Sequence, residues 1–141
     1  LYSLFNKPLV YTTYKLLEKK PFSSVSESSS IPTLDLAYVS YETAMNGDVN
    51  LPPLIILHGL LGSKSNWSSL SKVIHKKTGR KIIAIDSRNH GDSPHSSEHT
   101  YKHMVEDIVV LLKKLGIPKV SVLGHSMGGR TAMLLSLLQV Y

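Results

Sequence analysis

The chain has 141 residues, of which 42% are hydrophobic, and this is enough to bury one modest hydrophobic core. It contains no cysteine, which excludes disulfides and thiolate metal sites, and its seven histidines are spread over separate segments, so we expect no metal ion. The net charge of +6 comes without a nucleic-acid-binding motif, and no stretch approaches the roughly 20 apolar residues of a membrane span, so neither a nucleic-acid partner nor a transmembrane segment is expected.

Residues 1–33 differ in composition from the rest of the chain. They contain four lysines against two glutamates, and six of the residues from 23 to 30 are serines, which is typical of a flexible linker. Lysines spaced among Leu, Val and Tyr suit the end of a mitochondrial targeting segment, and a basic disordered tail is the alternative. We therefore divide the chain into a basic, serine-rich segment at 1–33 and a folded part at 34–141.

The folded part begins with two predicted strands and a helix. Residues 34–42 alternate between apolar and polar side chains, as a half-buried strand does, and Asn46-Gly47 marks a turn after them. Residues 54–57 are wholly apolar, which favours a strand buried on both faces. Gly79 stands where the next helix would end. The apolar residues at helical spacing in that helix, which we expect in the core, are Trp67, Leu70, Val73 and Ile74.

Two further pairs of a strand and a helix follow. After Lys81, residues 82–85 are again apolar, and the strand at 119–123 is followed by a helix-forming run at 131–135. Between them lies an amphipathic helix that Gly116 and Pro118 end. Its apolar side chains are Tyr101, Met104, Val105, Ile108, Leu111, Leu112 and Leu115. This order predicts an α/β fold, with a mostly parallel sheet and helices on both faces.

One serine stands between the last predicted strand and the last predicted helix. The strand at 119–123 leads into G-H-S-M-G-G, an arrangement typical of a nucleophile elbow. The chain has to turn so sharply at Ser126 that bulky neighbours would collide, and Gly124 and Gly128 remove those collisions. We therefore predict that Ser126 is a catalytic nucleophile rather than part of a structural turn.

The second apolar strand ends in H-G-L-L-G, a loop that belongs at the carboxyl edge of the sheet. In an acyl-transfer site the oxyanion is held by the backbone N–H after the nucleophile and by one from the first strand-to-helix loop. Here these are the amides of Met127 and Leu60. We expect His58 to support the loop through side-chain to backbone hydrogen bonds rather than to act as a base. Gly59 and His125 are further loop-support residues.

The third apolar strand leads into the polar loop D-S-R-N-H-G-D-S-P. Four of its side chains are candidates for catalysis: Asp86, Arg88, His90 and Asp92. In a loop with so many polar groups, these groups more often form hydrogen bonds with one another than transfer protons. We therefore expect these residues to have a structural role.

The motifs H-G-L-L-G-S, D-S-R-N-H-G-D-S-P and G-H-S-M-G-G, in this order and at these separations, resemble the α/β-hydrolase superfamily. They are most similar to the group that contains α/β-hydrolase domain-containing protein 11 and the fungal ethanol acetyltransferases. The resemblance covers about residues 34 to 138, and it implies that 34–141 is the N-terminal part of an α/β-hydrolase domain. It also implies a mitochondrial protein, with the cytoplasm as the alternative.

The activity implied by the resemblance is hydrolysis of an ester or thioester, or O-acetyl transfer to an alcohol, through an acyl-enzyme. No cofactor is implied, and acetyl-CoA is a candidate substrate. In the resembled family the triad acid and histidine follow the nucleophile, but no Asp, Glu or His follows Ser126 here. We therefore expect an N-terminal fragment, and the alternative function is a non-catalytic fragment without the triad acid and base.

A fragment ending near residue 141 would leave the strand at 119–123 as an open edge beside an apolar helix. A serine hydroxyl without its base is also a poor nucleophile at neutral pH. We therefore expect the isolated chain to be poorly soluble or oligomeric and to lack esterase and acetyltransferase activity.

Six basic residues occur in one stretch with no acidic residue among them: Lys64, Lys72, Lys76, Lys77, Arg80 and Lys81. On a surface helix such a run is usually a solvated face. We prefer this interpretation to a site for acyl-CoA phosphates or for an anionic membrane. The expected partner is a small-molecule ester, thioester or alcohol.

Overall fold

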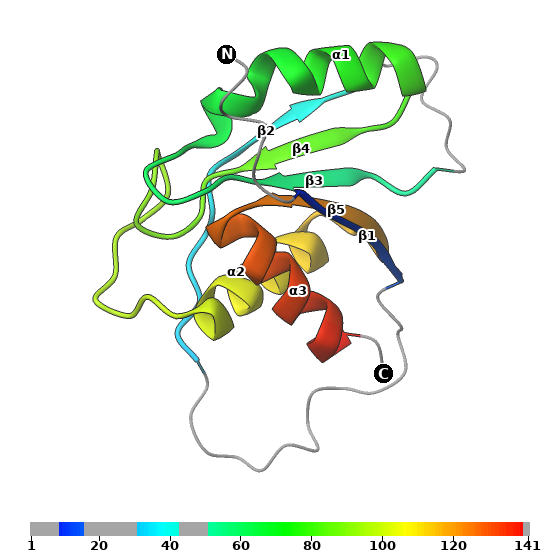
Figure 1. The fold of residues 1–141 in the computed structure, drawn as a ribbon. Coiled ribbons are helices and arrows are strands. Elements are labelled where there is room, and N and C mark those ends of the chain that lie inside the picture. The colour runs from blue at the N-terminus through cyan, green and yellow to red at the C-terminus, as the bar shows by residue number, and fades with distance from the viewer. Residues whose placement is uncertain (1–8, 16–30, 43–50, 140–141) are drawn as a thin grey trace.

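A computed structural model describes residues 9–15, 31–42 and 51–139, which form a five-stranded sheet with helices on both faces (Figure 1). The elements in chain order are β1 (Leu9–Lys15), β2 (Tyr38–Tyr41), β3 (Leu54–Leu57), the short 3-10 helix η3 (Lys64–Trp67), α1 (Ser68–Thr78), β4 (Ile82–Ile85), α2 (Tyr101–Lys114), β5 (Lys119–His125) and α3 (Met127–Gln139). Across the sheet the strands lie in the order β1-β5-β3-β4-β2.

The three strands at the centre of the sheet are parallel. β3 pairs with β4 on one side and with β5 on the other, so that Leu54 lies opposite both Ile82 and Ser121. Every residue of β3 and β4 is buried, as expected for strands that are covered on both faces. The outer strands run antiparallel, β1 against β5 and β2 against β4. The predicted α/β fold is therefore confirmed, with a parallel centre and antiparallel outer strands.

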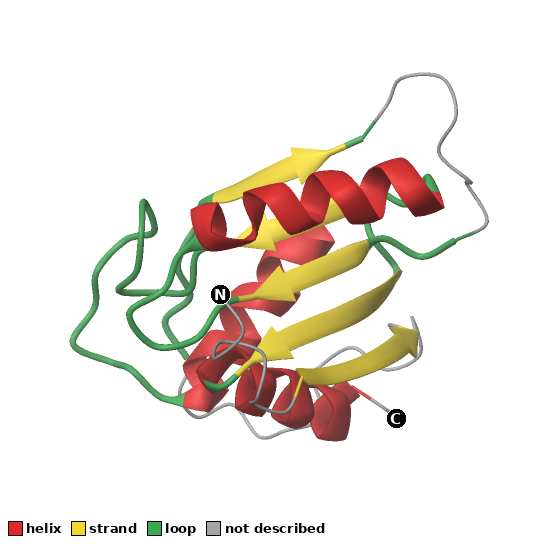
Figure 2. Cartoon of the chain, turned by 45° about the horizontal axis from the view of Figure 1, so that its top comes forward, coloured by secondary structure: helices red, strands yellow, loops and turns green. Residues whose placement is uncertain are grey.

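β1 lies within the segment 1–33, for which no strand is predicted. It pairs with β5 from Leu9 opposite His125 to Lys15 opposite Lys119 (Figure 2). The open edge predicted for residues 119–123 is therefore wrong, because β5 has a partner strand on each side. Backbone N–H and C=O groups require such partners, and the β-branched and aromatic run V-Y-T-T-Y in β1 favours a strand. The serine-rich stretch at 23–30 and the turn expected at Asn46-Gly47 lie outside the described residues.

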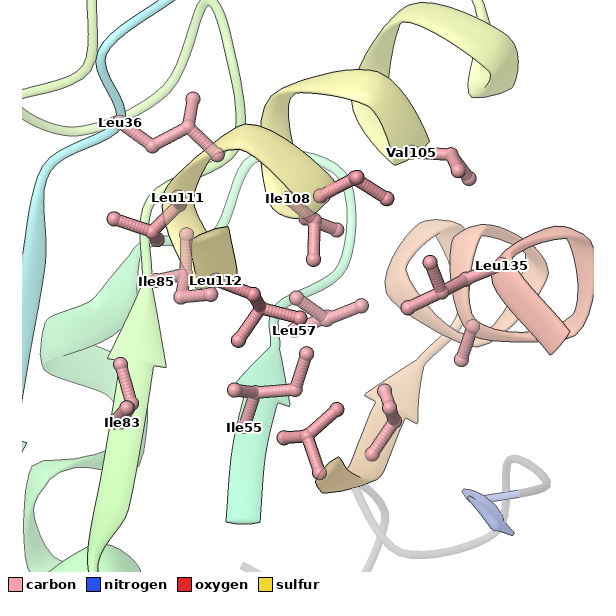
Figure 3. Packing of buried hydrophobic residues seen from close by; sticks show 14 of the residues in the cluster. Leu36, Ile55, Leu57, Ile83, Ile85, Val105, Ile108, Leu111, Leu112 and Leu135 are labelled. Atoms are coloured by element: carbon pink, nitrogen blue, oxygen red, sulfur yellow. The ribbon is translucent and has the colours of Figure 1, made fainter. Parts of the chain in front are cut away.

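The two faces of the sheet carry separate hydrophobic layers. α1 covers one face, whereas α2 and α3 lie together on the other (Figure 2). Because side chains alternate along a strand, neighbouring residues of β3 and β4 enter different layers. The layer under α2 and α3 includes Ile55, Leu57, Ile83 and Ile85 (Figure 3). The layer under α1 contains Leu54, Ile56, Ile82 and Ala84.

The predicted core stripe, which lies on η3 and α1, is only partly correct. Trp67 and Ile74 pack partly buried against the sheet, but Leu70 and Val73 are 37% and 48% exposed. The side of the helix that faces the sheet is centred on Ser71, which is fully buried. Leu70 precedes Ser71 and Val73 precedes Ile74, and both of these following residues face the sheet. Because one residue corresponds to about 100° of helix rotation, Leu70 and Val73 lie beside the sheet-facing side of the helix rather than on it.

α2 follows the prediction closely, whereas β2 differs from it in length. α2 begins after Thr100, whose hydroxyl accepts a hydrogen bond from the backbone N–H of His103, and Gly116 follows its end with a φ of 64°. β2 is shorter than the predicted strand at 34–42. Its preceding residues bond elsewhere, because the Leu34 amide donates to Asp107 and the Ala37 amide donates to Ser93. Within the described ranges, every helix is too short or too polar to cross a membrane.

Candidate active site

Ser126 lies at the junction of β5 and α3, with no residue between the strand and the serine. Its φ is 53°, which is in the left-handed region that residues with a side chain rarely adopt. Such strain persists only where the surrounding structure holds it, and it is concentrated at functional sites. The backbone therefore presents Ser126 on the sharp turn that the G-H-S-M-G-G pattern predicts.

The two glycines beside Ser126 allow the strand and helix to approach each other. A Cβ atom added to Gly124 would collide with the backbone of Gly128 and Gly129, and one added to Gly128 would collide with the carbonyls of Leu57 and His58. In addition, the Gly128 amide donates a 3.1 Å hydrogen bond to the His58 carbonyl. The start of α3 is thus held against the end of β3, and this places Ser126 at the carboxyl edge of the sheet.

Ser126 opens into a pocket of about 420 Å³. Leu60, Met104 and Met127 form its apolar lining. The polar lining comes from His99, Thr100, Tyr101 and Arg130. Tyr101, which is predicted as part of the apolar stripe of its helix, thus lines the pocket together with three polar residues for which the sequence predicts no role. No motif links the four residues, because they come from two helix ends that are distant in the sequence.

The two predicted oxyanion residues lie together in this pocket. Met127 is the first residue of α3, where a backbone N–H has no partner within the helix. Leu60 belongs to a tight loop in which the Gly62 amide donates to the Gly59 carbonyl at 3.0 Å, and Leu61 has a φ of 61°. Within the described ranges neither the Met127 nor the Leu60 amide has a hydrogen-bond acceptor. Both are thus able to donate to a ligand.

His58 connects this loop to the end of β4. Its Nδ1 lies 2.8 Å from the Gly59 carbonyl, and its Nε2 accepts a 3.1 Å hydrogen bond from the Ser87 amide. The ring therefore carries its proton on Nδ1. Burial lowers the pKa of His58, which favours this neutral form. With both nitrogens bonded to backbone groups, His58 has no nitrogen left for Ser126.

His125 and Gly59 meet on the other side of the serine. A Cβ atom on Gly59 would approach the His125 ring and the Cβ of Ser126 closely. The His125 ring also contacts Trp67, with 6.5 Å between the ring centres. Within the part of the chain that the structure describes, no side chain hydrogen bonds to the Ser126 hydroxyl. The close approach of Gly59 and His125 therefore helps to fix the position of the serine.

Asp86 is the centre of the polar loop after β4. The buried carboxylate accepts hydrogen bonds from the Lys64 amide at 2.6 Å, from the Asp92 amide at 2.9 Å and from the Lys64 ammonium group. Burial raises the pKa of Asp86, but these hydrogen bonds outweigh it and hold the pKa below its usual value. Gly91 lies against the carboxylate with a φ of 52°, where a Cβ atom would not fit. Asp86 is thus ionised, and its carboxylate connects the start of η3 at Lys64 to the loop after β4 at Asp92.

Arg88 is fully buried and bonded through the whole guanidinium group. It forms a two-pronged ion pair with Asp107, at 2.7 and 2.8 Å, and donates to the carbonyls of Glu98 and Pro32. No motif in the sequence marks Asp107. The available signal is an acidic residue on the otherwise apolar face of α2, between Met104 and Leu111.

The two remaining polar candidates of the loop differ in exposure. His90 bonds the Arg88 carbonyl through Nδ1 at 2.8 Å and lies between the rings of His58 and His99, at 5.0 and 5.8 Å. Asp92 is exposed and receives the Lys64 ammonium at 2.6 Å. All four candidates of the loop therefore have partners within the loop or beside it, as a structural role requires.

The six basic residues predicted as one solvated face divide into two groups. Lys64 bonds to Asp86 and Asp92, Lys81 pairs with Glu42 at 3.0 Å, and Arg80 donates to the Pro52 carbonyl. The group that remains exposed on α1 is Lys72, Lys76 and Lys77. Among the described residues no group of three or more His, Asp or Glu side chains is placed to hold a metal ion.

Known proteins are similar to this chain in sequence. The sn-1-specific diacylglycerol lipase ABHD11 of Mus musculus is 46% identical over 115 residues, which cover 82% of this chain and 36% of the lipase. A probable alcohol acetyltransferase of Saccharomyces cerevisiae is 41% identical over 122 residues, which cover 82% of this chain and 35% of that protein. The chain thus spans about a third of the length of these curated relatives.

A solved structure described as a marine microorganism esterase superimposes with a TM-score of 0.67 and 39% identity, over 75% of this chain and 38% of the esterase. Residues 52–139 match the family described as the alpha/beta hydrolase fold. This match includes the three parallel strands, all three α-helices and Ser126. The chain therefore belongs to the α/β-hydrolase fold family.

Proposed function

We propose that this chain carries the nucleophile and the oxyanion hole of an enzyme that cleaves or transfers acyl groups of esters or thioesters. The single observation that carries the proposal is Ser126, held at a φ of 53° in a pocket that the residues of both predicted oxyanion amides also line. A strained serine between a strand and a helix is the geometry that a nucleophile elbow requires.

In the proposed reaction the Ser126 oxygen attacks the acyl carbonyl while its proton passes to a base. The negative charge that develops on the carbonyl oxygen is stabilised by the N–H groups of Leu60 and Met127. Collapse of the tetrahedral intermediate expels the alcohol or thiol, which takes up a proton, and leaves the acyl group on Ser126. Water or an alcohol then attacks the acyl-enzyme and regenerates the serine.

The base and its acidic partner are not among the residues that follow Ser126 in this chain. His58 is occupied by backbone bonds, so we assign the triad base and acid to the remaining length that the relatives have and this chain does not span. The second candidate, a fragment without catalytic activity, is favoured by the Ser126 hydroxyl, which lacks a hydrogen-bonded base within the described part of the chain.

The identity of the acyl acceptor distinguishes a hydrolase from an acetyltransferase. The relatives carry names of both kinds, a diacylglycerol lipase and a probable alcohol acetyltransferase. Hydrolysis and transfer differ only in whether water or an alcohol reaches the acyl-enzyme. We therefore propose assays of the full-length protein with acetyl-CoA in the presence and absence of ethanol.

The nucleophile is tested with a fluorophosphonate probe, which reacts with activated serines. Full-length protein should be labelled at Ser126, and Ser126→Ala should abolish labelling. Labelling of another serine, with activity retained in Ser126→Ala, would show that Ser126 is not the nucleophile.

The oxyanion hole is tested at Leu60, because proline removes the backbone N–H and alanine retains it. Loss of one oxyanion donor typically lowers turnover by about 10² to 10³ fold. Leu60→Pro should therefore lose far more activity than Leu60→Ala. Equal losses in the two variants would indicate that Leu60 acts through packing.

A further inference from the structure

Arg130 brings a positive charge into the pocket of Ser126. It lines the pocket from the first turns of α3, four residues after the serine, and its amide donates a 3.1 Å hydrogen bond to the Ser126 carbonyl. Four residues advance a helix by about 6 Å and return to nearly the same face. The backbone of Arg130 is thus about one helical turn from the nucleophile.

The Arg130 guanidinium is held toward the pocket wall by Tyr101. Its Nη1 donates to the Tyr101 hydroxyl at 3.2 Å, and Tyr101 itself lines the pocket. No carboxylate of the described residues forms an ion pair with Arg130. Its charge therefore has no counter-ion on the described surface.

The rest of the described pocket lining does not balance this charge. It contains no Asp or Glu, and burial, together with the charges of His90 and Arg88, lowers the pKa of His99. His99 is therefore mainly neutral at pH 7. Among the described residues that line the pocket, Arg130 is thus the charged side chain. A guanidinium in such a position matches the planar geometry of a carboxylate.

We infer that Arg130 recognises a carboxylate on the substrate, close to the acyl carbonyl that Ser126 attacks. This inference rests on the proposed function and narrows its substrate class. Because the backbone of Arg130 is about one helical turn from Ser126, its side chain favours an anion a few bonds from the scissile carbonyl. The pyrophosphate of a CoA thioester lies at the far end of the long pantetheine arm and fits this separation poorly.

The carboxylate can belong to the acyl group or to the leaving group, and two pairs of esters separate these sources. For the acyl side, the pair is p-nitrophenyl hydrogen glutarate and p-nitrophenyl valerate, which have acyl chains of equal length. For the leaving-group side, the pair is p-carboxyphenyl valerate and its methyl ester. The quantity measured is the ratio of kcat/KM for the charged ester to kcat/KM for its neutral partner, in full-length protein.

Arg130→Gln should lower this ratio about 10-fold for one pair, because a hydrogen bond to a charged group is lost. Arg130→Lys should retain part of the preference, since it keeps the charge but not the planar donor pair. The matched control is Lys102→Gln, which removes an exposed cation next to Tyr101 that does not line the pocket, and it should leave the ratio unchanged.

Unchanged ratios for both pairs in Arg130→Gln, with Ser126 still labelled by the fluorophosphonate probe, would overturn the inference and leave the proposed function standing. An equal fall in Lys102→Gln would also overturn it, because the effect would then come from the general field of the surface. Full-length protein without Ser126 labelling or ester cleavage would contradict both proposals.

Discussion

Breaking the buried ion pair between Arg88 and Asp107 should lower stability much more than breaking the exposed pair between Lys114 and Asp35. The side chains of Arg88 and Asp107 are inaccessible to solvent and are joined at 2.7 and 2.8 Å. Lys114 and Asp35 are joined at 2.8 Å, but their side chains are 60% and 71% exposed. The two pairs have similar lengths and differ in burial, so they form a matched comparison.

Asp107→Ala would leave the Arg88 guanidinium buried without a counter-charge and the Leu34 amide without its acceptor. Loss of one partner of a buried pair typically lowers the free energy of unfolding by about 3 to 5 kcal/mol. Since Arg88 keeps its hydrogen bonds to the Glu98 and Pro32 carbonyls, we expect a value near the lower limit, about 3 kcal/mol. Asp35→Ala breaks an exposed pair and should cost about 0 to 1 kcal/mol.

Urea unfolding followed by circular dichroism measures both effects. With a denaturant slope of about 1 to 3 kcal/mol per molar urea, the Asp107→Ala midpoint should fall by about 1 to 3 M. Replacing both partners, Arg88→Met with Asp107→Leu, should recover part of the loss because no unpaired charge remains. Equal midpoints for Asp107→Ala and Asp35→Ala, or a double variant less stable than Asp107→Ala, would refute the reasoning.

Three further predictions concern the residues that shape the site. Gly124→Ala should lower the free energy of unfolding by about 3 kcal/mol, because its Cβ meets backbone that cannot move, whereas Gly116→Ala, with a φ of 64° and open space, should cost about 1 to 2 kcal/mol. Thermal melting in the opposite order would contradict this. Ser71→Ala should stabilise the chain by about 1 kcal/mol, because the buried Ser71 hydroxyl has no hydrogen-bond partner among the described residues, and a lowered melting temperature would argue against it. Burial lowers the pKa of His58 in the folded chain, so the unfolded chain binds a proton first as the pH falls below about 6.5. The free energy of unfolding should therefore decrease below that pH, whereas above it the neutral His58 makes its full contribution to stability. Denaturant midpoints measured from pH 7.5 to 5 should show this decline, and His58→Gln should reduce its slope; an unchanged slope would exclude His58 as its source.

The parts of the site that depend on local backbone geometry could be predicted from the sequence. The turn at Ser126 needs a small residue at 124, because a Cβ atom there would meet the backbone of Gly128 and Gly129, and this constraint acts within five residues. The pattern G-H-S-M-G-G also contains Gly128, although the backbone that excludes a side chain there belongs to Leu57 and His58 of the distant strand β3 and the residue after it. The end of α2 at Gly116 likewise depends on local geometry.

The parts that depend on contacts between distant segments could not be predicted in this way. The rotation of α1, which exposes Leu70 and Val73, is set by how one helix fits a sheet face. The pairing of β1 with β5 joins residues more than a hundred positions apart. The pocket wall from residues 99 to 101 meets Arg130 only after α2 and α3 pack together. Neither hydrophobic periodicity nor a short motif specifies such contacts.

The buried polar groups of the loop after β4 connect the two sides of the pocket. His58 links the oxyanion loop to the amide of Ser87, the neighbour of Arg88, and Arg88 in turn holds the carbonyl of Glu98, just before the pocket wall that begins at His99. His58 and Arg88 form these contacts as hydrogen bonds to backbone groups, and a backbone group has few alternative positions. A substitution at Arg88 should therefore move the wall at His99 relative to Ser126 as well as lower stability. The loop after β4, for which the sequence predicts a structural role, thereby influences the proposed chemistry indirectly, because the position of the pocket wall at His99 relative to Ser126 depends on it.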